Sequence, residues 1–254
     1  MVPKYKYPFP IICKLIFCAL LGRHWSFRDL ASRLVSHQEP PFDIQGRENI
    51  PHQGPCVLTF NHYHRPGFQA WWLALTIASL VPVEMQWVVT GELTFPGSRV
   101  GFFGRPLSRW VLRRLAHTFG FILMPPMPPR PQDVQMRAAA VREVLTVVRR
   151  TPSMLLGLAP EGGDNVGGGL SHPAPGAGRF GALLASAGMQ FVPIGAWEDN
   201  GVFHMRFGPK YQLNSPHGNL ADEKDRSAAH EIMKHIAVLL PEGLRGDYAK
   251  SNGS

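Results

Sequence analysis

The sequence predicts an α/β fold, in which a mostly parallel central sheet is flanked by helices and preceded by an N-terminal apolar helical segment that associates with membranes. Short apolar runs alternate with segments of helical period from about residue 42 onward. This alternation is typical of parallel sheets whose strands are joined by helices. An apolar run at residues 7–22, interrupted by Lys14, comes before that pattern. Together the observations place a terminal helix ahead of a domain built on a sheet.

The N-terminal run is shorter than the roughly 20 residues that span a bilayer. The residues after it, Arg23-His24-Trp25, do not resemble the small-residue cleavage site of a secretory signal. We therefore expect a helix in the membrane interface, with Lys14, Arg23 and Trp25 near the headgroups, at the cytoplasmic face. The alternative is an ordinary core helix of a soluble protein.

Length and charge limit the remaining possibilities. A chain of 254 residues can form one sizeable core, and we expect a membrane-associating region at 1–40, a catalytic domain at 41–240 and a tail at 241–254. The 26 basic and 18 acidic residues give a net charge of +8, which favours anionic partners without identifying them. Nucleic acid is not expected, because no recognition module accompanies the charge.

Cysteine usage indicates a reducing environment. Cys13, Cys18 and Cys56 are odd in number, and two of them lie in the apolar terminal run, so they predict no disulfide framework. No paired Cys or His spacing suggests zinc. We expect no metal and no bound cofactor.

Each element of the α/β domain follows from local pattern. A periodic apolar stretch at 27–35 ends before Pro40-Pro41, where the character of the chain changes. Short apolar runs then predict strands at 42–45, 56–60, 84–89, 120–124, 154–158, 190–194 and 202–207. Helical periodicity predicts helices at 68–80, 107–117, 133–150, 179–187 and 222–240.

Two segments are predicted to lack regular secondary structure. Residues 125–131 hold five prolines and indicate a stiff surface connection. Residues 162–178 are rich in glycine and proline, and a loop of this length inside a compact domain is more often functional than idle.

The first candidate for chemistry is His62, which follows the predicted strand 56–60 and precedes a helix. The carboxyl ends of parallel strands are where such folds place their ligands. An imidazole with a pKa of about 6.5 can accept a proton near neutral pH. The alternative is a hydrogen-bonded loop residue.

The second candidate is the segment Glu161-Gly162-Gly163-Asp164, which follows the predicted strand 154–158. Glycines after the acid let a ligand approach the backbone, and exposed amides there can hold an anion. The alternative is a turn with a solvated acid. Two strand-end motifs of this kind are more specific together than either is alone.

The order of these motifs resembles the glycerolipid acyltransferase superfamily, which includes the 1-acylglycerol-3-phosphate and other lysophospholipid acyltransferases. The resemblance runs from about residue 42 to residue 207. The matching segments are Phe42-Asp43-Ile44-Gln45-Gly46, Asn61-His62, Glu92-Leu93 with Pro96-Gly97, Gly120-Phe121-Ile122, Pro160-Glu161-Gly162, Pro175-Gly176-Ala177, Val192-Pro193-Ile194 and Arg206-Phe207-Gly208-Pro209.

The resemblance implies acyl transfer from a thioester, acyl-CoA or acyl carrier protein, to the hydroxyl of a lysophospholipid or related lipid acceptor. His62 is then the general base, and nearby donors stabilise the tetrahedral oxyanion. Asn61, Arg65, Glu161, Gly162 and Gly163 are the residues expected to bind substrate. The chain would act in phospholipid biosynthesis at a membrane surface.

The sequence departs from the family at three motif positions. Gly67 occupies the place of the aspartate in the family's His-x4-Asp motif. The second motif lacks its terminal arginine, because Pro125-Pro126 follow Met124, and Asp164 stands where the third motif keeps an arginine. One hypothesis joins these departures: Asp164 is a second catalytic residue that supplies the missing carboxylate. Its alternative is a turn-forming acid.

Under the same hypothesis, Arg65, Arg130 or Arg179 replaces the lost cationic contacts. If the missing aspartate has instead weakened catalysis, the chain is a lipid-binding or acyl-thioester-binding protein on the same fold. The retention of His62 together with Glu161 favours the enzyme.

Three further patterns allow two interpretations each. His64 is either a second functional imidazole or a loop residue. The residues Trp71, Trp72, Leu75 and Ile77 form either core or one wall of an acyl-chain channel, with core favoured. Near-helical spacing of Arg105, Arg109, Arg113 and Arg114 indicates either a solvated face or a surface toward lipid headgroups.

Overall fold

The computed structural model describes residues 3–93, 101–126, 130–163, 169–214 and 217–249. Its helices are α1 (Phe9–Leu21), α2 (Phe27–Val35), α3 (Trp71–Leu80), α4 (Gly101–Phe119), α5 (Val134–Arg150), α6 (Ala177–Ser186) and α7 (Ala221–Ala237). Its strands are β1 (Asp43–Gln45), β2 (Cys56–Phe60), β3 (Gln86–Thr90), β4 (Ile122–Met124), β5 (Leu155–Leu158), β6 (Gln190–Asp199) and β7 (Val202–Phe207).

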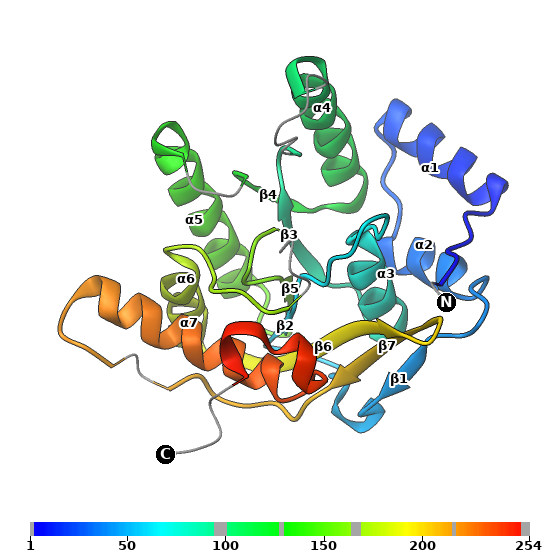
Figure 1. Ribbon diagram of the computed structural model, residues 1–254. Coiled ribbons are helices and arrows are strands. Elements are labelled where there is room, and N and C mark those ends of the chain that lie inside the picture. The colour runs from blue at the N-terminus through cyan, green and yellow to red at the C-terminus, as the bar shows by residue number, and fades with distance from the viewer. Residues whose placement is uncertain (1–2, 94–100, 127–129, 164–168, 215–216, 250–254) are drawn as a thin grey trace.

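The strands form one seven-stranded sheet in the order β1-β7-β6-β2-β5-β3-β4. Every neighbouring pair is parallel except β6 and β7. Figure 1 shows α1 to α4 on one side of this sheet and α5 to α7 on the other. The predicted fold class, an α/β fold with a mostly parallel sheet flanked by helices, is confirmed. Membrane association of the N-terminal helix stays a prediction.

The chain leaves the adjacent strands β2 and β5 toward opposite edges of the sheet. From β2 it passes through α3 to β3 and β4 on one side, and it returns through β5 to β6 on the other. In open α/β sheets, such a switch point leaves a crevice outside the carboxyl ends of the strands. The segments after β2 and β5 therefore border the place where this fold class binds ligands.

The predicted strand at 190–194 is too short, because β6 continues to Asp199 and pairs with β7 as a hairpin. Asn200 and Gly201 form the two-residue turn, with φ of 49° and 84°. Positive φ at both positions is the requirement of a type I′ turn, for which Asn-Gly is a preferred dipeptide. The longer strand carries Glu198 toward the end of β2, where it contributes to the candidate site described below.

The predicted helix at 107–117 is also too short. Helix α4 begins at Gly101 and continues through Pro106. Proline has no N–H to donate and usually occupies the first helical turn, which is why the pattern indicated a start near residue 107. In the structure this proline lies inside the helix, so the helix gains a turn that carries Arg105.

Close packing fixes β5 against its neighbour β3. A side chain at Gly157 would meet the Trp87 ring at 2.4 Å, and Trp87 is almost fully buried. The indole therefore occupies the space that a larger residue in β5 would need. This contact holds the strand that leads to Glu161.

The helices of the N-terminal region pack on the same core as the sheet. Leu30, Ala31 and Leu34 of α2 belong to the main hydrophobic cluster, and α1 packs against α4. Among the described residues, the longest apolar helical window falls short of what a bilayer crossing requires. The boundaries at 1–40, 41–240 and 241–254 stay a prediction.

Candidate active site

The two strand-end motifs lie on adjacent parallel strands. Strand β2 pairs with β5, with Thr59 opposite Leu158, so the chain leaves both strands at the same edge of the sheet. His62 follows one strand by two residues, and Glu161 follows the other by three. The sheet therefore brings together residues that are separated by 99 positions in the sequence.

Glu161 is joined directly to the backbone of His62. Its Oε2 atom accepts the His62 N–H at 2.7 Å, and its Oε1 atom accepts the Ser171 N–H at 3.0 Å and the Ser171 hydroxyl at 3.2 Å. The side chain is buried, with only 8% of Glu161 exposed. Both carboxylate oxygens are thus used to hold the turn after β2 against the loop at residue 171.

Burial sets the acidity of this carboxyl group. It raises the pKa of Glu161 above its ordinary value, although hydrogen bonds from Ser171 and His62 act in the opposite direction. The protein therefore disfavours the ionised form more than it stabilises it. A buried carboxyl group whose bonds go to backbone donors is suited to positioning the histidine.

Asn61 is committed to the neighbouring strand β6. Its Nδ2 donates to the Ala196 carbonyl at 2.8 Å, and its Oδ1 accepts the Ala196 N–H at 2.7 Å. This two-way bond continues the β2–β6 ladder past the last strand residue. The amide fixes the direction in which the chain enters His62, and its expected contact with substrate stays a prediction.

Arg65 is paired with Glu198 of β6. Its Nε and Nη2 both donate to the Glu198 carboxylate, the latter at 2.9 Å. The hydroxyl of Tyr5 also donates to Glu198, so the segment before α1 is tied to the same group. The carboxylate balances the charge of Arg65, and substrate binding by this guanidinium stays a prediction.

Gly67, which aligns with the aspartate of the resembled motif, has an unusual backbone conformation. Gly67 has φ of 81° and is exposed, and a Cβ at this position would lie 3.6 Å from Nη1 of Arg65. A positive φ at this value suits glycine and strains residues with a side chain. An aspartate at this position would therefore have to adopt a strained backbone conformation.

The glycines after Glu161 differ in their surroundings. Gly162 has φ of 71°, and its N–H donates to the Ala159 carbonyl at 3.1 Å, which closes a turn. Among the described residues, a Cβ at Gly163 would meet nothing within 4 Å, so no described group covers that side of the backbone. Asp164, the expected replacement for the motif aspartate, lies outside the described residues.

A small cavity adjoins this turn. It has a volume of about 140 Å³ and lies between the ends of β3, β4 and β5 and the helices α5 and α6. Its walls are mostly apolar, and Gly162 and Arg137 also line it. A hollow of about 790 Å³ lies at the opposite edge, beside His52, Met85 and Met154 ahead of β2, β3 and β5, and it is remote from the chemistry proposed for His62.

The other candidate cations contact carboxylates other than Glu198. Arg130 contacts Glu92 and Asp133, and Arg179 lies 4.0 Å from the exposed Asp222. Arg130 therefore belongs to a group of arginines that is described further below. Arg179 is a surface residue of α6.

The aromatic stretch after the histidine motif is mainly core. Trp72 and Ile77 are fully buried and Leu75 is almost so, whereas Trp71 is half exposed. Trp72 stacks on Tyr5 and donates through Nε1 to the Tyr7 hydroxyl at 2.7 Å. The preference for core over an acyl-chain wall is confirmed for the three buried residues.

Sequence patterns alone missed three residues of this site. Tyr5 lies in a segment without a distinguishing pattern. Ser171 lies in the glycine- and proline-rich segment 162–178, whose pattern marks the loop and not this residue. Glu198 lies beyond the predicted end of β6, but the Asn200-Gly201 hairpin signal would have extended the strand to include it.

Comparison with solved structures finds a similar fold. The chain is similar to the crystal structure of the 1-acyl-sn-glycerophosphate (LPA) acyltransferase PlsC from Thermotoga maritima, with a TM-score of 0.52 and 14% sequence identity. The match covers 90% of this chain and 80% of that chain. No family model and no curated protein matches the sequence. At this identity the likeness shows the fold.

Proposed function

We propose that the chain transfers an acyl group from a thioester to the hydroxyl of a lysophospholipid or related lipid, with His62 as the general base. The observation that carries the proposal is the hydrogen bond from the His62 backbone to Glu161. It joins the two strand-end motifs at the switch point of a fold shared with a lysophosphatidic acid acyltransferase.

The proposed reaction is a direct transfer. The His62 imidazole removes the acceptor hydroxyl proton while that oxygen attacks the thioester carbonyl carbon. The tetrahedral intermediate collapses by breaking the carbon–sulfur bond, and the leaving thiolate takes the proton from the imidazolium. The products are an ester and a free thiol, with acyl-CoA or acyl carrier protein as the donor and no covalent acyl-enzyme.

Three contacts support the segment that carries the histidine. Asn61 anchors the turn to β6, Glu161 anchors it to the loop after β5, and Arg65 anchors it through Glu198. Holding a catalytic group in a fixed geometry is a large part of catalysis, because misplacement weakens attack steeply. For the ring itself, we propose that Asp164 acts as the orienting carboxylate.

We also propose that α1 and α4 bring the enzyme to the membrane surface. Exposed apolar side chains on these two packed helices are Phe9, Ile16, Phe17, Leu20, Leu21, Leu107, Trp110 and Val111. Arg23 lies over the Phe17 ring of this surface, and Lys14 of α1 lies over the nearby Trp25 ring. An apolar face bordered by cations suits an anionic interface such as the cytoplasmic leaflet.

The experiment is an acceptor panel. Purified full-length protein is incubated with labelled acyl-CoA or acyl carrier protein and with lysophosphatidic acid, other lysophospholipids or monoacylglycerol, beside His62→Ala. Label in an esterified product for at least one acceptor, absent in the variant, supports the proposal. Saturable lipid binding without transfer to any acceptor would instead identify a binding protein on this fold.

A further inference from the structure

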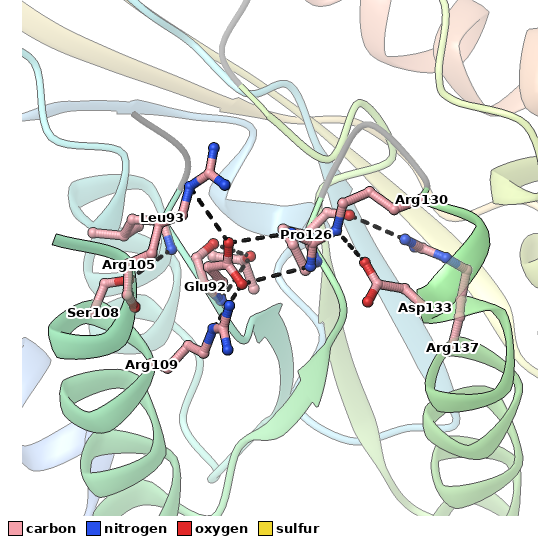
Figure 2. Close-up of polar contacts among 10 residues, drawn as sticks. Glu92, Leu93, Arg105, Ser108, Arg109, Pro126, Arg130, Asp133 and Arg137 are labelled. Carbon is pink, nitrogen blue, oxygen red and sulfur yellow. Dashed lines mark hydrogen bonds and ion pairs between the residues drawn. The ribbon is translucent and has the colours of Figure 1, made fainter. Parts of the chain in front are cut away.

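Three arginine side chains converge on one buried carboxylate beyond the end of β3. Glu92 is 4% exposed. Its oxygens lie 2.8 Å from Nε of Arg109, 3.3 Å from Nη1 of Arg130 and 3.9 Å from Nε of Arg105. Figure 2 shows Glu92 enclosed by the three guanidinium groups, which come from α4 and from the segment before α5.

A second carboxylate and a fourth arginine extend the group. Arg130 also bonds Asp133 through Nε, and Arg137 of α5 donates to the Pro126 carbonyl at 3.1 Å. We refer to Arg105, Arg109, Arg130 and Arg137 as the arginine cluster. Within the part of the chain that the structure describes, the cluster sets four guanidinium groups against the two carboxylates of Glu92 and Asp133, which leaves two positive charges in excess.

This arrangement exceeds what the folding of the segment requires. One bidentate arginine satisfies a buried carboxylate, and crowding further like charges around it opposes stability. The Arg105 and Arg109 side chains are 49% and 48% exposed, so many of their N–H donors face solvent. Despite burial, the pKa of Glu92 lies below its ordinary value because Arg130 and Arg109 donate to it, so the surrounding field is strongly positive.

The cluster is built on fixed elements. Arg105 and Arg109 lie one turn apart on α4, and the Ser108 hydroxyl between them accepts the Leu93 N–H at 3.2 Å. That bond fixes the residue after Glu92 to the helix. The guanidinium groups are therefore held in position before any ligand arrives.

The cluster also lies near the candidate active site. Strand β3 is separated from β2 only by β5, and with neighbouring strands about 4.8 Å apart the ends of β3 and β2 are roughly 10 Å from each other. Arg137 lines the same cavity as Gly162, next to Glu161. An extended lipid headgroup can thus reach from the cluster to His62.

We propose that the arginine cluster binds the phosphomonoester group of the acceptor lipid. A phosphomonoester carries a charge of about −1.5 to −2 at neutral pH, which matches the excess of the cluster, and arginine forks bind its oxygens in pairs. The 3′-phosphate of CoA is also a phosphomonoester. The assignment of the cluster to the acceptor lipid therefore rests on the proposed function. None of these arginines occupies a motif position, so the cluster supplies the cations that the motifs lack.

The test measures binding without catalysis. Full-length protein is titrated with sn-glycerol 3-phosphate, inorganic phosphate and CoA by calorimetry. Arg105→Gln is the first variant, because its contact with Glu92 at 3.9 Å leaves little for the fold to lose. Arg113→Gln is the matched control, since it removes the same charge from the exposed face one turn beyond Arg109.

Arg105→Gln should weaken glycerol phosphate binding about tenfold, equivalent to one charged hydrogen bond, and Arg113→Gln should change it less than about twofold. Glu92→Gln removes the negative charge that competes with phosphate for these arginines, and it should tighten the binding of glycerol phosphate. Equal effects of the two arginine variants would overturn the proposal. Weakened CoA binding with unchanged glycerol phosphate binding would assign the cluster to the donor and overturn its assignment to the acceptor.

Kinetics separates this inference from the proposed function. Arg105→Gln should raise the KM for lysophosphatidic acid and leave kcat/KM for monoacylglycerol unchanged. If Arg105→Gln transfers acyl groups to every acceptor with the kinetics of wild type, the proposed role of the arginine cluster is refuted and the proposed function stands. Cluster-dependent phosphate binding in a protein that transfers no acyl group would support the cluster and refute the proposed function.

Discussion

The Glu161 carboxylate accepts the backbone N–H of His62 at 2.7 Å, across two adjacent parallel strands. The acid therefore acts on the main chain that carries the imidazole. Its other oxygen holds Ser171, so a single buried side chain closes the two loops that border the site. The positions of both loops depend on this contact.

Replacing Glu161 should lower both the stability of the protein and its catalytic rate. Glu161→Ala leaves the N–H groups of His62 and Ser171 without their acceptor, at about 1–3 kcal/mol each, and should lower kcat about tenfold or more. Glu161→Gln keeps one acceptor oxygen and should be less impaired. Initial rates and melting temperatures test this order, with the exposed Glu242→Ala as control. Full kcat in Glu161→Ala would contradict the positioning role.

Restoring the family aspartate at position 67 should not restore a catalytic pair. The backbone there has φ of 81° and directs a Cβ toward Arg65, so a new carboxylate would pair with that guanidinium. Gly67→Asp and Gly67→Asn should each lose about 1 kcal/mol of stability from backbone strain, with kcat nearly unchanged. Denaturant unfolding and initial rates measure both quantities. A large rise in kcat for Gly67→Asp alone would show that the family pair can form.

The Glu92 network should make stability depend on acid pH. Because Arg130 and Arg109 hold the pKa of Glu92 below its ordinary value of 4.5, its contribution is present above that value and is lost as pH falls through the folded pKa. Wild type should therefore be more stable than Glu92→Gln at pH 7, with the difference shrinking below pH 4.5. Unfolding curves across this range test the sign. A difference that grows on acidification would contradict it.

The apolar face of α1 should control membrane binding. The double variant Phe17→Asp with Leu21→Asp places two charges on this face. Phe17 is 50% exposed and Leu21 is 57% exposed, so the fold should tolerate both substitutions. Sedimentation with vesicles that contain phosphatidylglycerol should fall about tenfold or more, since each buried apolar side chain contributes about 1.5–3 kcal/mol. Leu183→Asp with Val238→Asp on exposed positions of α6 and after α7 is the control. Equal losses in both pairs would refute a specific docking face.

Much of the fold could be predicted from sequence because periodicity reports burial. Strands β2 and β7 and helix α2 have the predicted bounds. Strand β2 is a continuous buried run, β7 alternates between buried and partly exposed residues, and α2 has helical period. Errors occurred where tertiary contacts override a local signal. Strand β6 continues because it pairs with β7. Helix α4 continues through Pro106 and contacts α1 and β4.

The site was predictable only where residues follow strand ends. His62 and Glu161 stand at such ends, and parallel pairing of β2 with β5 requires that they lie close together. The arginine cluster could not be predicted in this way. Spacing of Arg105 and Arg109 indicates one helix face, but nothing local shows that this face meets Glu92 and Arg130, because that meeting depends on how α4 packs beside β3.

The most direct test of the account is the rate of thiol release from acyl-CoA in the presence of the preferred acceptor, measured for wild type, His62→Ala and His64→Ala. The second variant removes an imidazole from the same loop and serves as the matched control. We expect His62→Ala to lose at least about a hundredfold in acceptor-dependent release, as removal of a general base does, while His64→Ala keeps most of it. Undiminished release in His62→Ala, with its fold intact, would contradict the central claim.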